Sequence, residues 1–248
     1  MSPGDLILIM QMQGASVNTT NTTAYGEITS YNNAGLYEFA CVSAVPGTTS
    51  ITVTLPLMNA YSASGNTQVI RVPRFTSLTV ATVGSIVAPA WNGATGGVVA
   101  IETTGSIALS TASAINVSGR GFRGGALDNN SSTAGSGPIT TYRSTSGNDG
   151  AEKGESIAGS ATAYDVLNGR YGRGAIANGG GGGYIGITSG TPARTVAGGA
   201  NGTTTSTAVT EFTPNGATVG AGGSLLTYNP VSSLFIPVSG TVLNDANG

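Results

Sequence analysis

The sequence predicts an all-β protein with almost no helix: a parallel β-helix-like or β-sandwich domain with long glycine-rich loops. Short segments of alternating apolar and polar residues recur along the chain, and Gly, Pro and Asn separate them, as in strands joined by turns. No segment combines a sustained 3.6-residue period with helix caps. Residues 96–119 hold three strand-like pieces in a short span, which suits one coil of a parallel β-helix.

Residues 1–90 form the expected N-terminal strand region, which begins with a strand at residues 4–13, GDLILIMQMQ. Both faces of this strand are apolar at first, and one face becomes polar at Gln11 and Gln13. The strand is therefore expected to start buried on both sides and to end near solvent. Pro, Gly and Asn signals divide the rest of the region into further predicted strands at residues 35–45, 50–57 and 67–75.

The second region, residues 91–223, combines the β-helix-like coil with a Gly/Ser/Asn-rich stretch. The three pieces of the coil are VVAIE, SIALS and AINVS, and small turns separate them. The low complexity that follows Gly119 is typical of disorder, whereas its interspersed Tyr, Ile and Val residues favour partial order. Residues 224–248 regain strand character and form the third, terminal segment.

Composition excludes several classes of protein. Charged residues make up 8% of the chain, against about 25% in an ordinary globular protein, so hydroxyls and amides must wet its surface. The net charge of −2 and the lack of a basic cluster argue against nucleic acid as a partner. The longest apolar run, LILIM, is far shorter than the roughly 18 residues that span a bilayer, so no membrane insertion is expected. Cys41 is the only cysteine; it is expected to be a buried small hydrophobe without a disulfide.

The stretch INVSGRGFRGGA, residues 115–126, contains a G-x-G-x-x-G pattern at Gly119, Gly121 and Gly124. A dinucleotide-binding turn needs a helix after the glycines, and GGALDNNSSTAGSG does not form one. We interpret the pattern as a sharp turn at the end of a β coil, with Phe122 covering an apolar edge. No cofactor-binding residue is assigned.

Catalytic groups are scarce. The chain has no histidine to act as general base for a serine or cysteine nucleophile. The sequence therefore predicts a protein that is not an enzyme, with no catalytic residues. A polysaccharide-active β-helix enzyme is kept as a remote alternative, which an Asp/Glu pair in a groove would support.

The one local carboxylate cluster is NDGAEKGES, residues 148–156. Asp149 and Glu155 are the candidate Ca²⁺ ligands, because hard cations bind several oxygens. Glu152 is a weaker third candidate, and Asp128 joins them if the earlier loop folds back. The alternative is a solvated polar turn without an ion.

Six phrases together resemble the large glycine-rich β domain found near the start of giant secreted cell-surface, adhesin-like proteins of Bacteroidetes and related bacteria. They are GDLILIMQMQGA, NAGLYEFA, QVIRVPRF, APAWNGATGGVVAIETTGSIAL, INVSGRGFRGGA and EKGESIAG, in this order within residues 4–190. The closing VSGTVLNDANG is similar to the first strand of the repeat modules that follow this domain. The resemblance implies no ligand-binding residue.

The resemblance also implies an extracellular, cell-surface location. The expected function is a non-enzymatic module for adhesion or structural presentation, with surface glycans or other cell-surface components as partners. The alternative is a self-assembling subunit of an extracellular filament. In that case the terminal strands, DLILIM or SSLFIPVSGTVL, would pair with the exposed sheet edge of a neighbour by β-strand addition.

Overall fold

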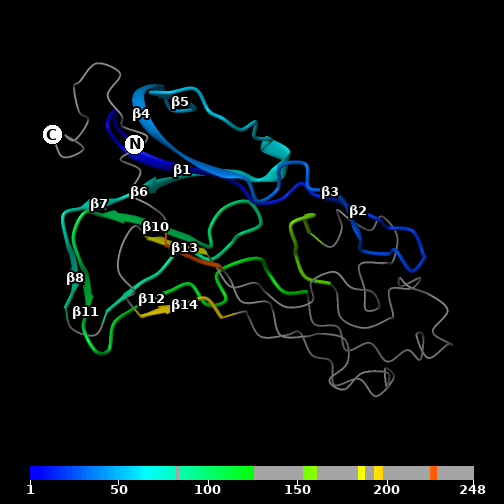
Figure 1. The fold of residues 1–248 in the computed structure, drawn as a ribbon. Helices are drawn as coiled ribbons and strands as arrows, with labels where there is room; N and C mark the ends of the chain where they lie inside the picture. Colours follow the sequence, from blue (N-terminus) through cyan, green and yellow to red (C-terminus); the bar gives the residue numbers. More distant parts are fainter. Residues whose placement is uncertain (82–83, 126–152, 161–183, 188–192, 198–223, 228–248) are drawn as a thin grey trace.

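The computed structural model describes residues 1–81, 84–125, 153–160, 184–187, 193–197 and 224–227. These residues form an all-β protein, as predicted, and the one helical element among them is a 3₁₀ turn, η1 (Ala63–Gly65) (Figure 1). Most of the predicted Gly/Ser/Asn-rich stretch and residues 228–248 lie outside the described residues. None of the described helical segments is long and apolar enough to cross a membrane.

The first part of the chain builds an antiparallel sheet with the strand order β5-β4-β1-β6. Its strands are β1 (Leu6–Gln11), β4 (Tyr37–Gly47), β5 (Ser50–Val53) and β6 (Thr67–Val72). Strand β1 is central, with Leu8 opposite both Phe39 and Ile70. A small pair, β2 (Ser16–Val17) and β3 (Ile28–Ser30), extends from it.

The central position of β1 argues against one form of the filament hypothesis. The filament alternative used DLILIM as a strand that pairs with a neighbouring chain, but both backbone edges of β1 are already occupied by β4 and β6. The other segment named for that route, residues 232–243, lies outside the described residues.

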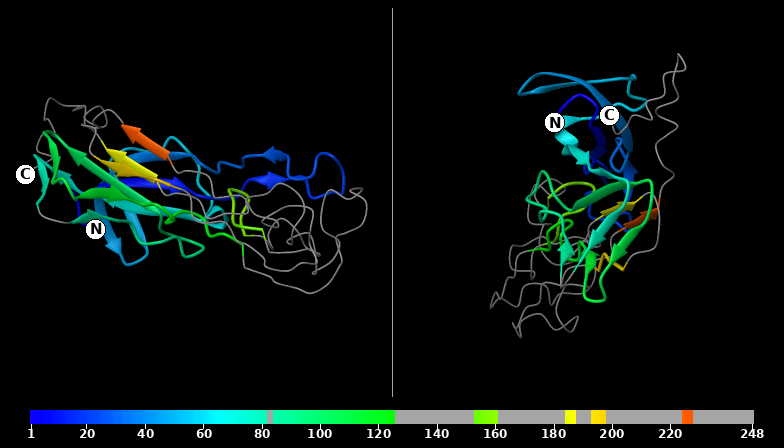
Figure 2. Two further views of the ribbon diagram at one scale, coloured as in Figure 1. Left: turned by 90° about the horizontal axis from the view of Figure 1, so that it is seen from below. Right: turned by 90° about the vertical axis from the view of Figure 1, so that its left-hand side faces the viewer.

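Downstream of Val72 the pairing becomes parallel, and strands stack in three ladders (Figures 1 and 2). The first ladder contains β7 (Arg74–Phe75), β10 (Val98–Thr103), β13 (Tyr184–Ile187) and β15 (Ser224–Thr227). The second contains β8 (Leu78–Val80) and β11 (Ile107–Leu109). The third contains β9 (Ser85–Ile86), β12 (Ala114–Asn116) and β14 (Arg194–Thr195).

The three strands predicted within residues 96–119 are therefore present as β10, β11 and β12. Each pairs in parallel with a strand from the preceding stretch, for example Ile107 with Leu78. Inward residues of all three ladders share one apolar cluster, whose fully buried members include Ile115, Val117, Ile185 and Ile187. Equivalent positions in successive strands thus stack into one core. This stacking buries enough apolar surface for strands of only two to six residues to be stable.

Strand β10 is buried on both faces, which explains its nearly continuous apolar run. Val99 and Ile101 belong to the cluster inside the ladders. Val98 and Ala100 point the other way and pack against Leu6, Leu8, Met10 and Val72 of the antiparallel sheet. The antiparallel sheet therefore covers the outer face of the first ladder (Figure 1).

The far face of the antiparallel sheet has its own apolar cluster, Ile7, Ile9, Ala40 and Val42. Val53 and Tyr61 pack against it, so residues 54–62, here called the crossover segment, run over this face between β5 and η1. The prediction that the first strand is buried on both sides is confirmed. Cys41 is half-buried against the cluster between the antiparallel sheet and β10, as a small apolar side chain without a disulfide. Burial raises the pKa of its thiol.

The prediction that this strand ends near solvent is wrong. Gln11 is 1% exposed and Gln13 is 3% exposed. Their side-chain amides are buried because each finds backbone partners on other segments: Gln11 Nε2 donates to the Asn32 carbonyl at 2.8 Å, and Gln13 Nε2 donates to the Ser156 carbonyl at 2.8 Å. A polar residue at the end of an apolar strand here marks a buried hydrogen bond rather than the surface.

Candidate functional site

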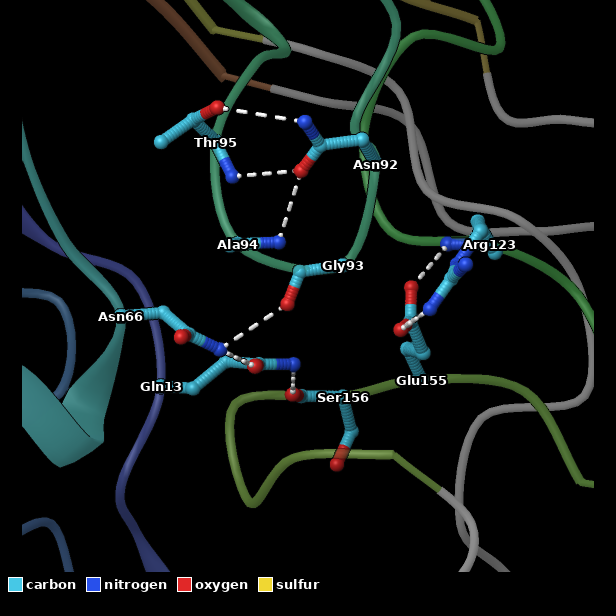
Figure 3. Close-up of polar contacts among 9 residues, drawn as sticks. All are labelled: Gln13, Asn66, Asn92, Gly93, Ala94, Thr95, Arg123, Glu155 and Ser156. Atoms are coloured by element: carbon cyan, nitrogen blue, oxygen red, sulfur yellow. Dashed lines mark hydrogen bonds and ion pairs between the residues drawn. The ribbon is translucent and has the colours of Figure 1, made fainter.

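Polar side chains from both halves of the fold converge where the antiparallel sheet meets the ladders (Figure 3). We call this place the amide junction and define it by Gln13, Asn66, Gln68, Asn92, Arg123 and Glu155, with the backbone that they bind. Gln13 lies just after β1, Asn66 caps η1, and Arg123 follows the turn after β12.

Gln13 joins three segments of chain. Its Nε2 donates to the Ser156 carbonyl, and its Oε1 accepts a hydrogen bond of 2.6 Å from Asn66 Nδ2. The same Asn66 amide donates to the Gly93 carbonyl at 3.1 Å. One neutral glutamine therefore connects the end of β1 to residues 153–160 and to Asn66, and Asn66 in turn binds the loop before β10 (Figure 3).

Two backbone features make room for the side-chain amides at this place. Asn66 has a φ of 52°, a left-handed conformation that asparagine tolerates better than most residues. Gly65 lies so close to the Gln11 amide that a Cβ would stand 2.4 Å from its Nε2. Glycine at this position is therefore required by space rather than by backbone angle.

Asn92 shapes the loop that presents the Gly93 carbonyl. Its Oδ1 accepts the backbone N–H groups of Ala94 and Thr95, both at 2.9 Å, which closes an Asx-type turn (Figure 3). Gln68 on β6 binds the end of this loop twice: it accepts from the Gly96 N–H at 3.0 Å and donates to the Gly96 carbonyl at 3.1 Å. The loop before β10 is thus fixed to the antiparallel sheet by amides alone.

Residues 153–160 dock onto this junction through an ion pair. Arg123 donates its backbone N–H to Glu155 Oε2 at 2.9 Å and its Nη2 to Glu155 Oε1 at 2.6 Å. The Glu155 N–H donates to the Arg123 carbonyl at 2.8 Å. On the other side, the Ile157 carbonyl accepts the N–H groups of Gly14 and Ala15. The segment is therefore held to the turn after β12 and to the end of β1.

The chain's single lysine, Lys153, is buried at 2% exposure in the same segment. Its ammonium lies 5.7 Å from the centre of the Tyr25 ring, a distance suited to a cation–π contact. The described end of the predicted carboxylate cluster, residues 153–156, is therefore packed into the protein.

The predicted calcium ligands fall partly on this segment. Glu155 is described, and both of its carboxylate oxygens are bound by Arg123. The other candidates, Asp149, Glu152 and Asp128, lie outside the described residues. Within the described part of the chain, no group of three or more His, Cys, Asp or Glu side chains is placed to hold a metal ion. The calcium hypothesis stays a prediction. Millimolar Ca²⁺ should raise the melting temperature and Asp149→Asn should remove the gain, whereas melting curves that are identical with and without chelator would contradict it.

The glycine pattern after β12 forms a turn. Arg120 donates its N–H to the Val117 carbonyl at 3.0 Å, and Gly119 has a φ of 65°. Phe122 packs edge-to-face on Trp91 with ring centres 5.4 Å apart, as expected of a residue that covers an apolar edge. Residues 126–152 lie outside the described residues, so whether a helix follows these glycines, as a dinucleotide site requires, stays a prediction beyond Gly125.

Chemically, the amide junction consists of four neutral amide side chains, which bind backbone groups, and one ion pair between Arg123 and Glu155. The described residues of the junction hold no nucleophile beside a general base, and the one carboxylate is paired with a guanidinium. Sequence reasoning missed the junction because its members are ordinary Gln and Asn residues. The available signal was their position: QMQG ends an apolar strand, and the turn dipeptide NG stands in the loop before another.

No protein-family model matches the chain, and neither a curated protein nor a solved structure matches it. The class that the structure defines is an all-β protein, and its function is argued from its own residues.

Proposed function

We propose that this chain is a non-enzymatic extracellular module that serves adhesion or structural presentation at a cell surface. The observation that carries the proposal is the use of the buried polar groups. Gln11, Gln13, Gln68 and Glu155 direct their side chains at the protein's own backbone or at Arg123. Such a network stabilises one arrangement of strands, which is what a presenting scaffold requires.

We further propose that the three ladders are the faces of a parallel β-helix-like solenoid, whose successive coils each contribute one strand to a face, and that the antiparallel sheet covers one of these faces. In-register parallel stacking in each ladder and the common apolar interior support this architecture. Solenoids offer long, regular faces that bind extended partners. Because the antiparallel sheet covers the first ladder, the second and third ladders supply the faces that are available.

The exposed residues in the strands of those faces include small, uncharged side chains. Thr79 and Ala108 are exposed in the second ladder, and Asn116 and Thr195 are exposed in the third. Hydroxyls and amides at regular spacing suit uncharged hydroxyl-rich ligands, so surface glycans or other cell-surface components are the partners that we propose. We propose neither nucleic acid nor membrane insertion as part of the function.

The enzyme alternative is not favoured by the described carboxylates. Asp5 is paired with Arg71, Glu102 with Arg74 and Glu155 with Arg123. Glu38 accepts two backbone N–H groups. A glycosidase needs one carboxyl group as acid and another as base or nucleophile beside the scissile bond. Each of these four carboxylates is bound to a structural partner, and the fifth described carboxylate, Glu27, is exposed.

Surface exposure is the property that tests the proposal. Intact cells that produce the protein are treated with protease, and the released peptides are identified by mass spectrometry. We expect peptides from exposed loops of this chain, while a cytoplasmic marker protein stays intact. If the chain is cleaved only after lysis, the extracellular proposal is wrong.

A further inference from the structure

The β5 edge of the antiparallel sheet carries an unusual concentration of exposed apolar side chains. We call this the β5 surface and define it by Val45, Ile51, Leu55, Leu57 and Met58. Met58 is 82% exposed, the highest value among the large apolar residues described. In Figures 1 and 2, β5 lies at the outer side of the sheet, away from the ladders.

The apolar side chains of the crossover segment are presented on a fixed backbone. Buried Glu38 accepts the Met58 N–H at 2.9 Å and the Asn59 N–H at 3.0 Å. Buried Gln11 accepts the Ser62 N–H at 2.9 Å through its Oε1. A loop held in this way loses little conformational entropy when it is covered, which favours binding.

Charge distinguishes this edge from the opposite edge of the same sheet. Residues 39–70 contain no Asp, Glu, Lys or Arg. The other edge strand, β6, carries Arg71 in an ion pair with Asp5 and lies beside β10. Natural sheets protect exposed edges with charges, with lysine above all, and the β5 edge has none.

We propose that β5 of one chain pairs with β5 of a second copy, antiparallel about a two-fold axis, with the apolar crossover segments packed beside the pair. A two-fold contact places each patch opposite itself, so a charge close to the two-fold axis meets its own copy and is repelled. A charge-free edge is self-complementary in this sense. Pro56 has no N–H, so the paired stretch is short and the dimer depends on concentration.

Sedimentation velocity over a wide range of protein concentration tests this proposal on the whole chain. We expect a monomer–dimer equilibrium that shifts to dimer as the concentration rises. Ile51→Lys and Met58→Lys each place a charge at the two-fold contact and should each weaken dimerisation at least tenfold. Both residues are exposed, so the melting temperature of the monomer should stay within about 2 °C of the original.

The matched control is Val69→Lys on β6, because Val69 is 42% exposed, close to the 37% of Ile51, and lies on the opposite edge of the same sheet. It should leave the dimerisation constant unchanged. A chain that stays monomeric at all concentrations, or equal weakening by Val69→Lys, overturns the proposal. Either result leaves the surface-exposure proposal standing, since dimerisation does not depend on where the protein is located.

Discussion

At the scale of single residues, buried neutral amides hold separate segments of the chain together by hydrogen bonds. Gln11, Gln13 and Gln68 each bind backbone groups of other segments. An amide can donate and accept at once, and burying it costs far less than burying a charge, provided that its partners are present. A chain with 8% charged residues can therefore still hold its loops in defined places.

Gly65→Ala should destabilise the protein by about 1–3 kcal/mol, because a Cβ there would overlap the Gln11 amide and the Gln13 carbonyl. Gly47→Ala is the matched control: the nearest atom to its Cβ would be Ser50 Oγ at 3.9 Å, so the change should be within about 0.5 kcal/mol. Urea unfolding measures both. Equal effects would show that the space around Gly65 is not limiting.

Two half-buried tyrosines should respond in opposite ways to loss of their hydroxyl. Tyr184 has a buried hydroxyl without a hydrogen-bond partner among the described residues, and burial raises its pKa to about 12. Tyr184→Phe should therefore raise the free energy of unfolding by about 1 kcal/mol. Burial and a hydrogen bond to Glu38 raise the pKa of Tyr61 to about 12, so Tyr61→Phe should lower stability. Thermal unfolding distinguishes them, and a destabilised Tyr184→Phe would contradict the assignment.

At the scale of elements, the crossover segment depends on one carboxylate of β4. Burial acts to raise the pKa of Glu38, but the N–H groups of Met58 and Asn59 and the Tyr61 hydroxyl outweigh it and hold the pKa below its usual 4.5. Because the pKa of Glu38 is lower in the folded state than in the unfolded state, its carboxylate stabilises the fold at pH values above the unfolded pKa. This contribution is lost as the pH falls below 4.5 through the folded value.

Glu38→Gln should cost about 1–3 kcal/mol at neutral pH, because the amide nitrogen cannot accept the second backbone N–H. At about pH 3, below the unfolded value of 4.5, the original chain has lost part of this contribution, so the difference between the two should shrink. Unfolding curves at both pH values measure it. Glu27→Gln, at an exposed carboxylate, should change neither curve, and a Glu38→Gln difference that is equal at both pH values would contradict the account.

At the scale of the whole molecule, local patterns predict strands, while their neighbours are set by contacts that are distant in sequence. The continuous apolar run LILI correctly predicts a strand that is buried on both faces, and VVAI correctly predicts a strand. Nothing local indicates that β1 lies between β4 and β6, or that β10 pairs with a strand that begins at Tyr184. The sequence pattern places Gln13 near solvent, because the partner that buries it, the Ser156 carbonyl, is 143 residues away and leaves no local signal.

The stacking of parallel strands on which the proposed function rests is tested most directly by disulfide trapping in a Cys41→Ser background. Asn116 and Thr195 are exposed and directly paired across the third ladder, so Asn116→Cys with Thr195→Cys should form a disulfide rapidly under mild oxidation. Asn116→Cys with Ala197→Cys is the control, since the register places Ala197 two residues further along, beyond the usual reach of about 7 Å.

Non-reducing electrophoresis and peptide mass spectrometry measure both rates. The account predicts fast, nearly complete cross-linking of positions 116 and 195 and slow, partial cross-linking of positions 116 and 197. Failure of the first pair to cross-link, or equal rates for the two pairs, would contradict the parallel register of the third ladder and with it the solenoid on which the proposed binding faces depend.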